Sequence, residues 1–150
     1  MNKLTIHCDG SSYHKDGRMG LGIAWFEDDN LEPCYIKGIN KHQKLGTSNE
    51  AEYLAIINAL IELKRKDHNA EEVLIVSDSE LVINQLNNIY VVRDPKLQQL
   101  YQEVYKLLSD FQTDWISFAW CPRTHPRQKV VDKISKQVNP YFIHKKKFGY

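Results

Sequence analysis

The sequence has few cysteines, no long apolar run and almost no net charge. Its three cysteines form no C-x-x-C pair, which argues against a disulfide framework or a zinc cage and favours a reducing compartment, so we expect a cytoplasmic protein. No apolar run approaches the ~20 residues needed to cross a bilayer, and the N-terminal segment reaches Asp9 too early for a signal peptide. We therefore expect no membrane partner. The net charge of +1 excludes a basic field over the whole chain.

The charge that is present is unevenly distributed. Residues 121–150 carry eight Lys/Arg and one acid, for +7, whereas residues 1–120 carry twelve Lys/Arg and eighteen acids, for −6. A basic end on an acidic body suggests a polyanion partner, and a solubilising tail is the alternative. With 150 residues, 42% of them hydrophobic, the chain fits one globular domain. We place it at 1–139, followed by a basic and aromatic tail at 140–150.

The first part of the chain predicts an antiparallel meander of three strands. Apolar and polar residues alternate up to Asp9, which predicts a strand over 4–9 that is followed by a turn over 10–12. Two further apolar runs, over 20–26 and 34–39, are separated by an acidic turn. Short connections of this kind join antiparallel neighbours.

After the meander the apolar period changes to that of helices alternating with strands. The predicted elements are a helix that begins at a cap within Thr47-Ser48-Asn49-Glu50 and runs to about Lys66, a strand over 73–76, a helix over 81–86 capped by Ser79, a helix that opens at Pro95, a strand over 115–120 and a final helix around 130–138. The run over 73–76 is wholly apolar, as in a buried parallel strand. The predicted fold class is therefore α/β, a mixed five-stranded sheet (three antiparallel strands plus two parallel) flanked by helices.

Four acidic residues occupy positions that bring side chains to the rim of such a sheet. Asp9 and Asp78 end two strands, and Glu52 and Asp132 lie near the starts of two helices. Clustered carboxylates repel one another unless a cation binds them, and hard oxygen ligands suit Mg²⁺ or Mn²⁺. Two such ions can hold the attacking water and the leaving oxygen of a phosphoryl displacement. Taken singly, Asp9 and Asp78 each fit an ordinary turn or cap residue, and it is their combination with Glu52 and Asp132 that indicates a metal site.

At these positions the sequence resembles the type 1 ribonuclease H family, over about residues 3–138. The matching segments are Cys8-Asp9-Gly10-Ser11, Thr47-Ser48-Asn49-Glu50-Ala51-Glu52-Tyr53, Ser77-Asp78-Ser79 and Gln128-Lys129-Val130-Val131-Asp132-Lys133-Ile134. The resemblance implies a ribonuclease H-like fold over 1–139. It also implies an endoribonuclease that cleaves the RNA strand of RNA–DNA hybrids and leaves 5′-phosphate and 3′-hydroxyl ends.

The resemblance also implies roles for individual residues. The catalytic metal ligands would be Asp9, Glu52, Asp78 and Asp132, which would bind two Mg²⁺ ions, with Mn²⁺ as a substitute. Contacts to the hybrid across its minor groove would come from Gly10, Ser11, Ser12, Ser48, Asn49 and Glu80. The tail lies outside the resemblance, but its charge suggests that Lys145, Lys146 and Lys147 would grip the duplex backbone. A tail that packs its aromatic residues on the body is the alternative.

Several positions depart from the family pattern. Ser48 stands where an asparagine is usual, and Glu80 stands where a glutamine commonly reads the minor groove; a carboxylate there accepts but cannot donate. Residues 87–96 hold only two basic residues, which indicates a variant without the basic protrusion of some bacterial members. His125 does not align cleanly with the mobile catalytic histidine, so either catalytic assistance or a plain loop role fits it.

Parts of the sequence also fit functions other than that of a ribonuclease H. A catalytically weak or silent module that binds hybrids or duplexes is the main alternative. Another nuclease or transferase of the same fold, such as a proofreading exonuclease or an integrase, is a second alternative. A proofreading exonuclease would show Asp-x-Glu on the first strand, where this chain has Asp9-Gly10-Ser11. A protein-interaction domain has only the tail in its support. The sequence contains no evident partner stripe of exposed apolar residues, so we expect a monomer.

Overall fold

The computed structural model describes residues 2–13 and 15–139. The strands are β1 (Lys3–Ser12), β2 (Arg18–Glu27), β3 (Tyr35–Leu45), β4 (Glu72–Ser77) and β5 (Ile116–Trp120). The helices are α1 (Ser48–Lys66), α2 (Glu80–Leu86), α3 (Pro95–Leu108) and α4 (Pro126–Val138). The element order is the one predicted from the sequence. The tail over 140–150, with its three lysines, lies outside the described residues.

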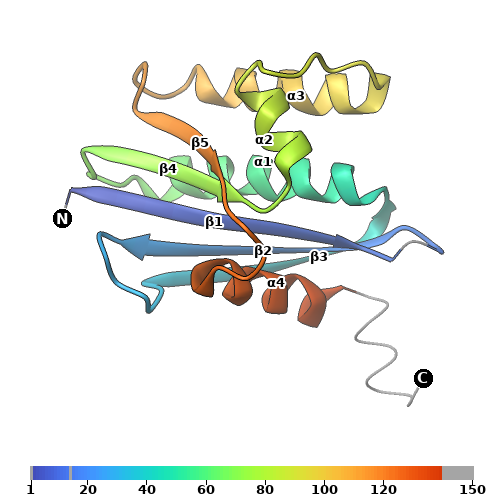
Figure 1. The fold of residues 1–150 in the computed structure, drawn as a ribbon, viewed down its shortest axis with the longest axis horizontal. Coiled ribbons are helices and arrows are strands. Elements are labelled where there is room, and N and C mark those ends of the chain that lie inside the picture. Colours follow the sequence, from blue (N-terminus) through green and yellow to red (C-terminus); the bar gives the residue numbers. More distant parts are fainter. Residues whose placement is uncertain (1, 14, 140–150) are drawn as a thin grey trace.

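The five strands form one mixed sheet in the order β3-β2-β1-β4-β5 (Figure 1). β1 pairs antiparallel with β2, and β2 with β3, whereas β4 pairs parallel with both β1 and β5. The helices form layers on the sheet: α1 packs on β1 and β2 and is covered by α3, while α4 packs on β2, β1 and β3 (Figure 1). The predicted fold class is confirmed.

Alternation along β1 assigns its side chains to the two faces of the sheet. Leu4 and Ile6 belong to the large core with α1, and both are fully buried. His7 and Asp9 point the other way and bond to residues of α4, Gln128 and Ser135 respectively. Because helices cover both faces of this central strand, its polar row is buried as well. This burial is what makes the environment of Asp9 unusual.

Glycines allow the helices to lie directly on the sheet near Asp9. A Cβ atom at Gly10 would come within 2.2 Å of the backbone of Ala51, so α1 touches β1 at this point. A Cβ atom at Gly20 of β2 would come within 2.2 Å of the carbonyl oxygen of Ser135, so α4 touches β2 in the same way. Any larger residue would push these helices, and the acids they carry, away from Asp9.

The structure corrects three boundaries. β1 does not turn at 10–12 but continues through Ser12, because Gly10 and Ser12 pair with β2. β3 likewise continues past 39 to Leu45. Asp132 lies in the middle of α4 and not near its start, because Pro126 opens the helix and His125 caps it. The predicted cap at Ser79 is confirmed, and the cap predicted within 47–50 is Thr47, which forms a capping box with Glu50. Among the described residues, no helix is long and apolar enough to span a membrane.

Candidate active site and metal centre

Three of the four predicted acids meet at one end of the central strands. Asp9 comes from β1, Asp78 follows the end of β4, and Glu52 projects from the early part of α1. One carboxylate oxygen from each lies within 4.8 Å of those of the other two. Because β1 and β4 run parallel, their acids reach the same edge of the sheet, and the close contact at Gly10 brings Glu52 to them.

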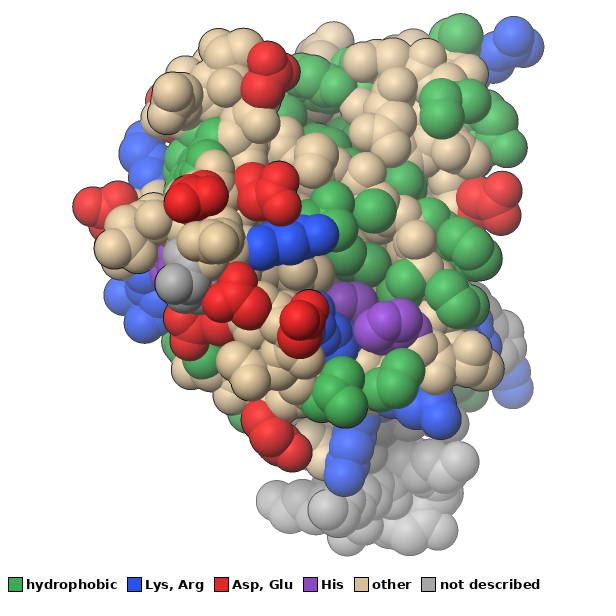
Figure 2. Space-filling model, turned by 60° about the vertical axis from the view of Figure 1, so that its left-hand side comes forward, with side chains coloured by type: hydrophobic (Ala, Val, Ile, Leu, Met, Phe, Trp, Pro, Cys, Tyr) green, Lys and Arg blue, Asp and Glu red, His purple; other side chains and the backbone are tan. Residues whose placement is uncertain are grey.

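The fourth acid lines the same cavity, which has a volume of about 420 Å³. Asp132 enters from α4, and its carboxylate lies 3.3 Å from the Lys136 ammonium one turn later. Its oxygens are outside the tight set of three. The cavity walls also include the predicted substrate-contacting residues Gly10, Ser11, Ser12, Ser48 and Asn49. On the face shown in Figure 2, acidic side chains gather with basic ones among them.

Glu52 is held in place by two donated hydrogen bonds. The backbone N–H of Gly10 donates to Oε1 at 2.8 Å, and the hydroxyl of Ser77 donates to Oε2 at 2.8 Å. Both bonds favour the charged form, yet burial and the charge of Asp78 prevail and raise the pKa of Glu52. The two bonds therefore fix the orientation of the Glu52 carboxylate, but both donors are neutral and do not balance its negative charge.

Burial also raises the pKa values of the other two acids, Asp9 and Asp78. Burial, followed by the neighbouring charge of Glu52, raises the pKa of Asp9. Burial also raises the pKa of Asp78, although Arg123 opposes the shift from 3.9 Å away. Arg123 is 81% exposed, so its charge is largely screened by water. Three carboxylates are thus held together with little compensation from the protein.

This arrangement fits divalent ions. The ligand atoms are carboxylate oxygens, which Mg²⁺ and Mn²⁺ prefer, and several come from fixed positions on two strands and a helix. Burial and mutual repulsion raise the pKa of Asp9 and of Glu52, and a cation bound between the carboxylates would favour their charged forms. Asp9, Glu52 and Asp78 could hold an ion together, with Asp132 on the adjoining wall.

His125 lies elsewhere. Its Nδ1 accepts a hydrogen bond from the backbone N–H of Arg127 at 3.1 Å, which caps α4. Its ring stacks on that of His7, with the centroids 5.4 Å apart, and it lines a separate hollow with Lys3, Thr5 and Arg127. The catalytic role predicted for His125 stays a prediction, and the position described here is that of a helix cap.

Two further predictions concern Glu80 and the segment that follows α2. Glu80 is the first residue of α2, and its side chain is exposed beyond the cavity walls. The segment over 87–94, between α2 and α3, is a short loop that carries Arg93 alone among basic residues.

Sequence reasoning missed two cations and two hydroxyls of the site. Lys136 could have been found, because it lies one helical turn after Asp132. Arg123 gives no such signal, since a loop brings it to Asp78 across the sheet edge. Ser77 and Ser135 each bond a buried acid from another element, which only the fold reveals.

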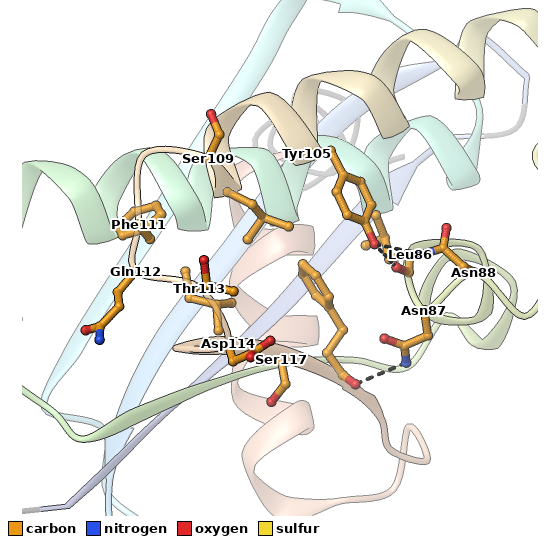
Figure 3. A pocket seen from close by; sticks show the side chains of 13 residues that line it. Leu86, Asn87, Asn88, Tyr105, Ser109, Phe111, Gln112, Thr113, Asp114 and Ser117 are labelled. Atoms are coloured by element: carbon orange, nitrogen blue, oxygen red, sulfur yellow. Dashed lines mark hydrogen bonds between the residues drawn. The ribbon is translucent and has the colours of Figure 1, made fainter.

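A larger hollow, of about 690 Å³, lies between the ends of α2 and α3 and strand β5 (Figure 3). Several of its polar groups bond to one another within the wall. The hydroxyl of Tyr105 donates to the carbonyl oxygen of Leu86, and the amide of Asn87 donates to that of Phe118. Asp114 is the acid on its lining, which gives it no clustered ligands. The acid-lined cavity is therefore the candidate active site.

Most of the chain matches a known protein family. The model of the reverse transcriptase-like family matches residues 7–138. Among curated relatives, the bifunctional protein Rv2228c of Mycobacterium tuberculosis is 30% identical over 136 residues, which is 89% of this chain. The chain spans about a third of the length of that relative, 34%.

Solved structures match the fold. The N-terminal RNase H domain of Rv2228c from Mycobacterium tuberculosis, solved as a fusion with maltose binding protein, has a TM-score of 0.80 at 24% identity and covers 97% of this chain and 99% of its own. LC11-RNase H1 in complex with an RNA/DNA hybrid has a TM-score of 0.81 at 20% identity and covers 93% of this chain and 99% of its own. The predicted resemblance is confirmed: the chain belongs to the reverse transcriptase-like family and has the ribonuclease H fold.

Proposed function

We propose that this protein is a ribonuclease H, an endonuclease that hydrolyses the RNA strand of RNA–DNA hybrids and leaves 5′-phosphate and 3′-hydroxyl ends. The observation that carries the proposal is the meeting of Asp9, Glu52 and Asp78 within 4.8 Å in a cavity that Asp132 also lines. A ribonuclease H1 of the same fold has been solved with an RNA/DNA hybrid, which supports the substrate class.

The four acids would hold two divalent ions, for which we propose Mg²⁺ with Mn²⁺ as a substitute. Bound ions of this kind supply an activated water and stabilise the leaving oxygen of a phosphodiester. The contribution of the chain is to fix the ligands before substrate arrives. Gly10 and Ser77 fix both oxygens of Glu52, so little reorganisation of that side chain remains at the moment of reaction.

Selection of RNA over DNA would fall to the polar wall of the cavity. Ser48 and Asn49 form the first turn of α1, beside the backbone of 10–12. Hydroxyl and amide groups at this position can bond a 2′-hydroxyl, which distinguishes the RNA strand. Arg123 and Lys136 stand on the same walls, where they can attract phosphate groups.

We further propose a monomer in the cytoplasm that grips the duplex with the lysines of its tail. The three free cysteines, Cys8, Cys34 and Cys121, support a reducing compartment. Deleting residues 140–150 should flatten the salt dependence of hybrid binding, because phosphate contacts release counterions.

The test is a cleavage assay on labelled RNA–DNA hybrid, double-stranded RNA and double-stranded DNA, with Mg²⁺ and Mn²⁺ compared. We expect cleavage of the hybrid only, and its loss in Asp78→Asn. Asp110→Asn is the matched control: it removes a surface carboxylate paired with Lys64 at 2.9 Å, and should cleave normally. Hybrid binding without any cleavage by the native protein would favour the silent binding module instead.

A further inference from the structure

The proposed function leaves unused a buried hydroxyl that contacts the carboxylate of Asp9 and the backbone carbonyl oxygen of Asp132. Ser135 lies on α4 one turn after Asp132 and is fully buried. Its Oγ lies 3.0 Å from Oδ2 of Asp9 and 2.8 Å from the carbonyl oxygen of Asp132. A single short side chain therefore bridges β1 and α4 inside the candidate metal centre.

A serine hydroxyl has one hydrogen to donate, so the two acceptors compete for it. The carbonyl oxygen of Asp132 lies inside a helix, where the N–H four residues later already supplies a donor. Within residues 2–13 and 15–139, the hydrogen bond that reaches the Asp9 carboxylate from another element is the one from Ser135, and no backbone N–H of these residues donates to it. The bond to Asp9 therefore supplies a donor to a buried carboxylate and links α4 to β1. The bond to the carbonyl oxygen of Asp132 is a local alternative within α4.

The sheet is built so that this short side chain can reach. Cβ atoms at Gly20 and Gly22 would come within 2.2 Å of the Ser135 carbonyl oxygen and 2.4 Å of the Val131 carbonyl oxygen. Both glycines lie on β2, next to β1, so α4 sits close enough for a hydroxyl one bond from Cβ to meet Asp9. The close approach of α4 and the contact to Asp9 are parts of one arrangement.

We propose that Ser135 is a positioning residue of the metal centre: its hydroxyl fixes the rotation of the Asp9 carboxylate, as Ser77 fixes that of Glu52. This inference rests on the proposed function, because it concerns the same acids. A carboxylate has about four lone-pair sites, so one donated bond leaves the remainder for a cation. Partners that orient a ligand carboxylate typically change metal affinity by about 10- to 100-fold when they are removed.

The chain offers a matched control. Ser109, at the exposed end of α3, makes the same local bond, from Oγ to the carbonyl oxygen of Lys106 three residues earlier, at 2.6 Å. Ser109→Ala removes that local bond alone, whereas Ser135→Ala removes the local bond and the contact to Asp9. Ser109→Ala therefore shows whether loss of a local serine-to-carbonyl bond far from the acids changes Mn²⁺ binding.

The experiment measures Mn²⁺ binding by calorimetry in the full chain, together with the Mg²⁺ dependence of hybrid cleavage. We expect Ser135→Ala to bind Mn²⁺ about tenfold more weakly than the native protein. It should need correspondingly more Mg²⁺ and keep a similar kcat at saturation, while Ser109→Ala binds normally. Ser135→Cys preserves the size and weakens the donor, so we expect the same direction of change, and this variant decides if Ser135→Ala does not fold.

Native affinity for Mn²⁺ in the Ser135 variants would overturn the inference, as would a native protein that binds no Mn²⁺. A different pattern of results would reject the proposed nuclease function and leave the role of Ser135 intact. If the native protein binds Mn²⁺ and the Ser135 variants bind it weakly, but no variant cleaves hybrid, the positioning role stands and the nuclease assignment falls.

Discussion

Two buried glutamates on α1 show how different two similar side chains can be. Glu52 is 7% exposed and Glu62 is 4% exposed. Glu62 accepts from the Arg65 guanidinium at 2.9 Å, the Lys37 ammonium at 2.6 Å and the Tyr35 hydroxyl at 2.7 Å. These donors lower the pKa of Glu62 to about 2. Glu52 has Gly10 and Ser77 as donors but carboxylates as its charged neighbours, and its pKa is raised.

The contrast distinguishes an acid that stabilises the fold, Glu62, from an acid that is placed to bind a cation, Glu52. Glu62 is compensated by the protein itself and ties β3 to α1, so nothing further is needed there. The cluster at Glu52 leaves negative charge that the fold does not neutralise, and such uncompensated sites are where binding and catalysis concentrate. Burial alone therefore does not mark a functional acid; its charged neighbours do.

The same substitution at both glutamates should have its largest effect on cleavage at one and on stability at the other. Glu52→Gln should lower hybrid cleavage more than a hundredfold, because a metal ligand that supplies several kcal/mol is weakened, while the fold persists. Glu62→Gln should leave kcat near native and lower the free energy of unfolding by about 2 kcal/mol, the scale of hydrogen bonds to charged groups. Cleavage kinetics and urea unfolding measure the two effects. The reverse pattern would exchange the roles assigned to these residues.

The contributions of Glu62 and Glu52 to the stability of the fold should change with pH in opposite directions. A carboxyl whose folded pKa is lowered stabilises the fold above its ordinary pKa and loses that effect as pH falls, so the contribution of Glu62 should fade from about pH 4.5 towards 2. A raised pKa acts the other way: the metal-free protein should lose stability as pH rises through the pKa of Glu52, about 7.

Melting temperatures between pH 5 and 8 with a chelator, repeated with Mg²⁺, would measure this second effect. Glu52→Gln should flatten the decline, and so should Mg²⁺, because the ion favours the charged carboxylates. A native protein that is as stable without metal at pH 8 as at pH 5 would contradict the uncompensated cluster.

The smallest expected effect concerns the cations beside the two sites. Lys37→Met should cost about 1 kcal/mol of unfolding free energy, because it removes a charged donor from buried Glu62. Arg123→Met should change that free energy by less than about 0.5 kcal/mol, as expected for an exposed ion pair with a 3.9 Å separation. Equal losses in the two variants would mean that Arg123 compensates Asp78 as fully as Lys37 compensates Glu62.

The sequence predicted the fold because local patterns and global topology agree. Period-2 alternation in β1, the apolar run of β4 and the caps at Thr47 and Ser79 each reappear in the structure. The end of β1 was misjudged because Gly10-Ser11-Ser12 has turn composition, whereas pairing with β2 extends the strand. Tertiary pairing overrode local preference there.

The candidate site was only partly predictable. Asp9, Glu52 and Asp78 follow from their places at element ends together with the family motifs. The contacts of Ser135 to Asp9, 126 residues apart, and of Arg123 to Asp78 depend on how α4 and its preceding loop cross the sheet. The spacing of residues along the chain does not encode such contacts. His125 lies in the loop where a catalytic histidine was expected, but its side chain lines a different hollow.

The most direct test of the central claim is the anomalous diffraction signal of Mn²⁺ in crystals of the protein soaked with the ion. We predict Mn²⁺ bound by the carboxylates of Asp9, Glu52 and Asp78, with its occupancy lost in Asp78→Asn. Mn²⁺ bound only at other surfaces, with this cavity empty at saturating concentration, would contradict the account.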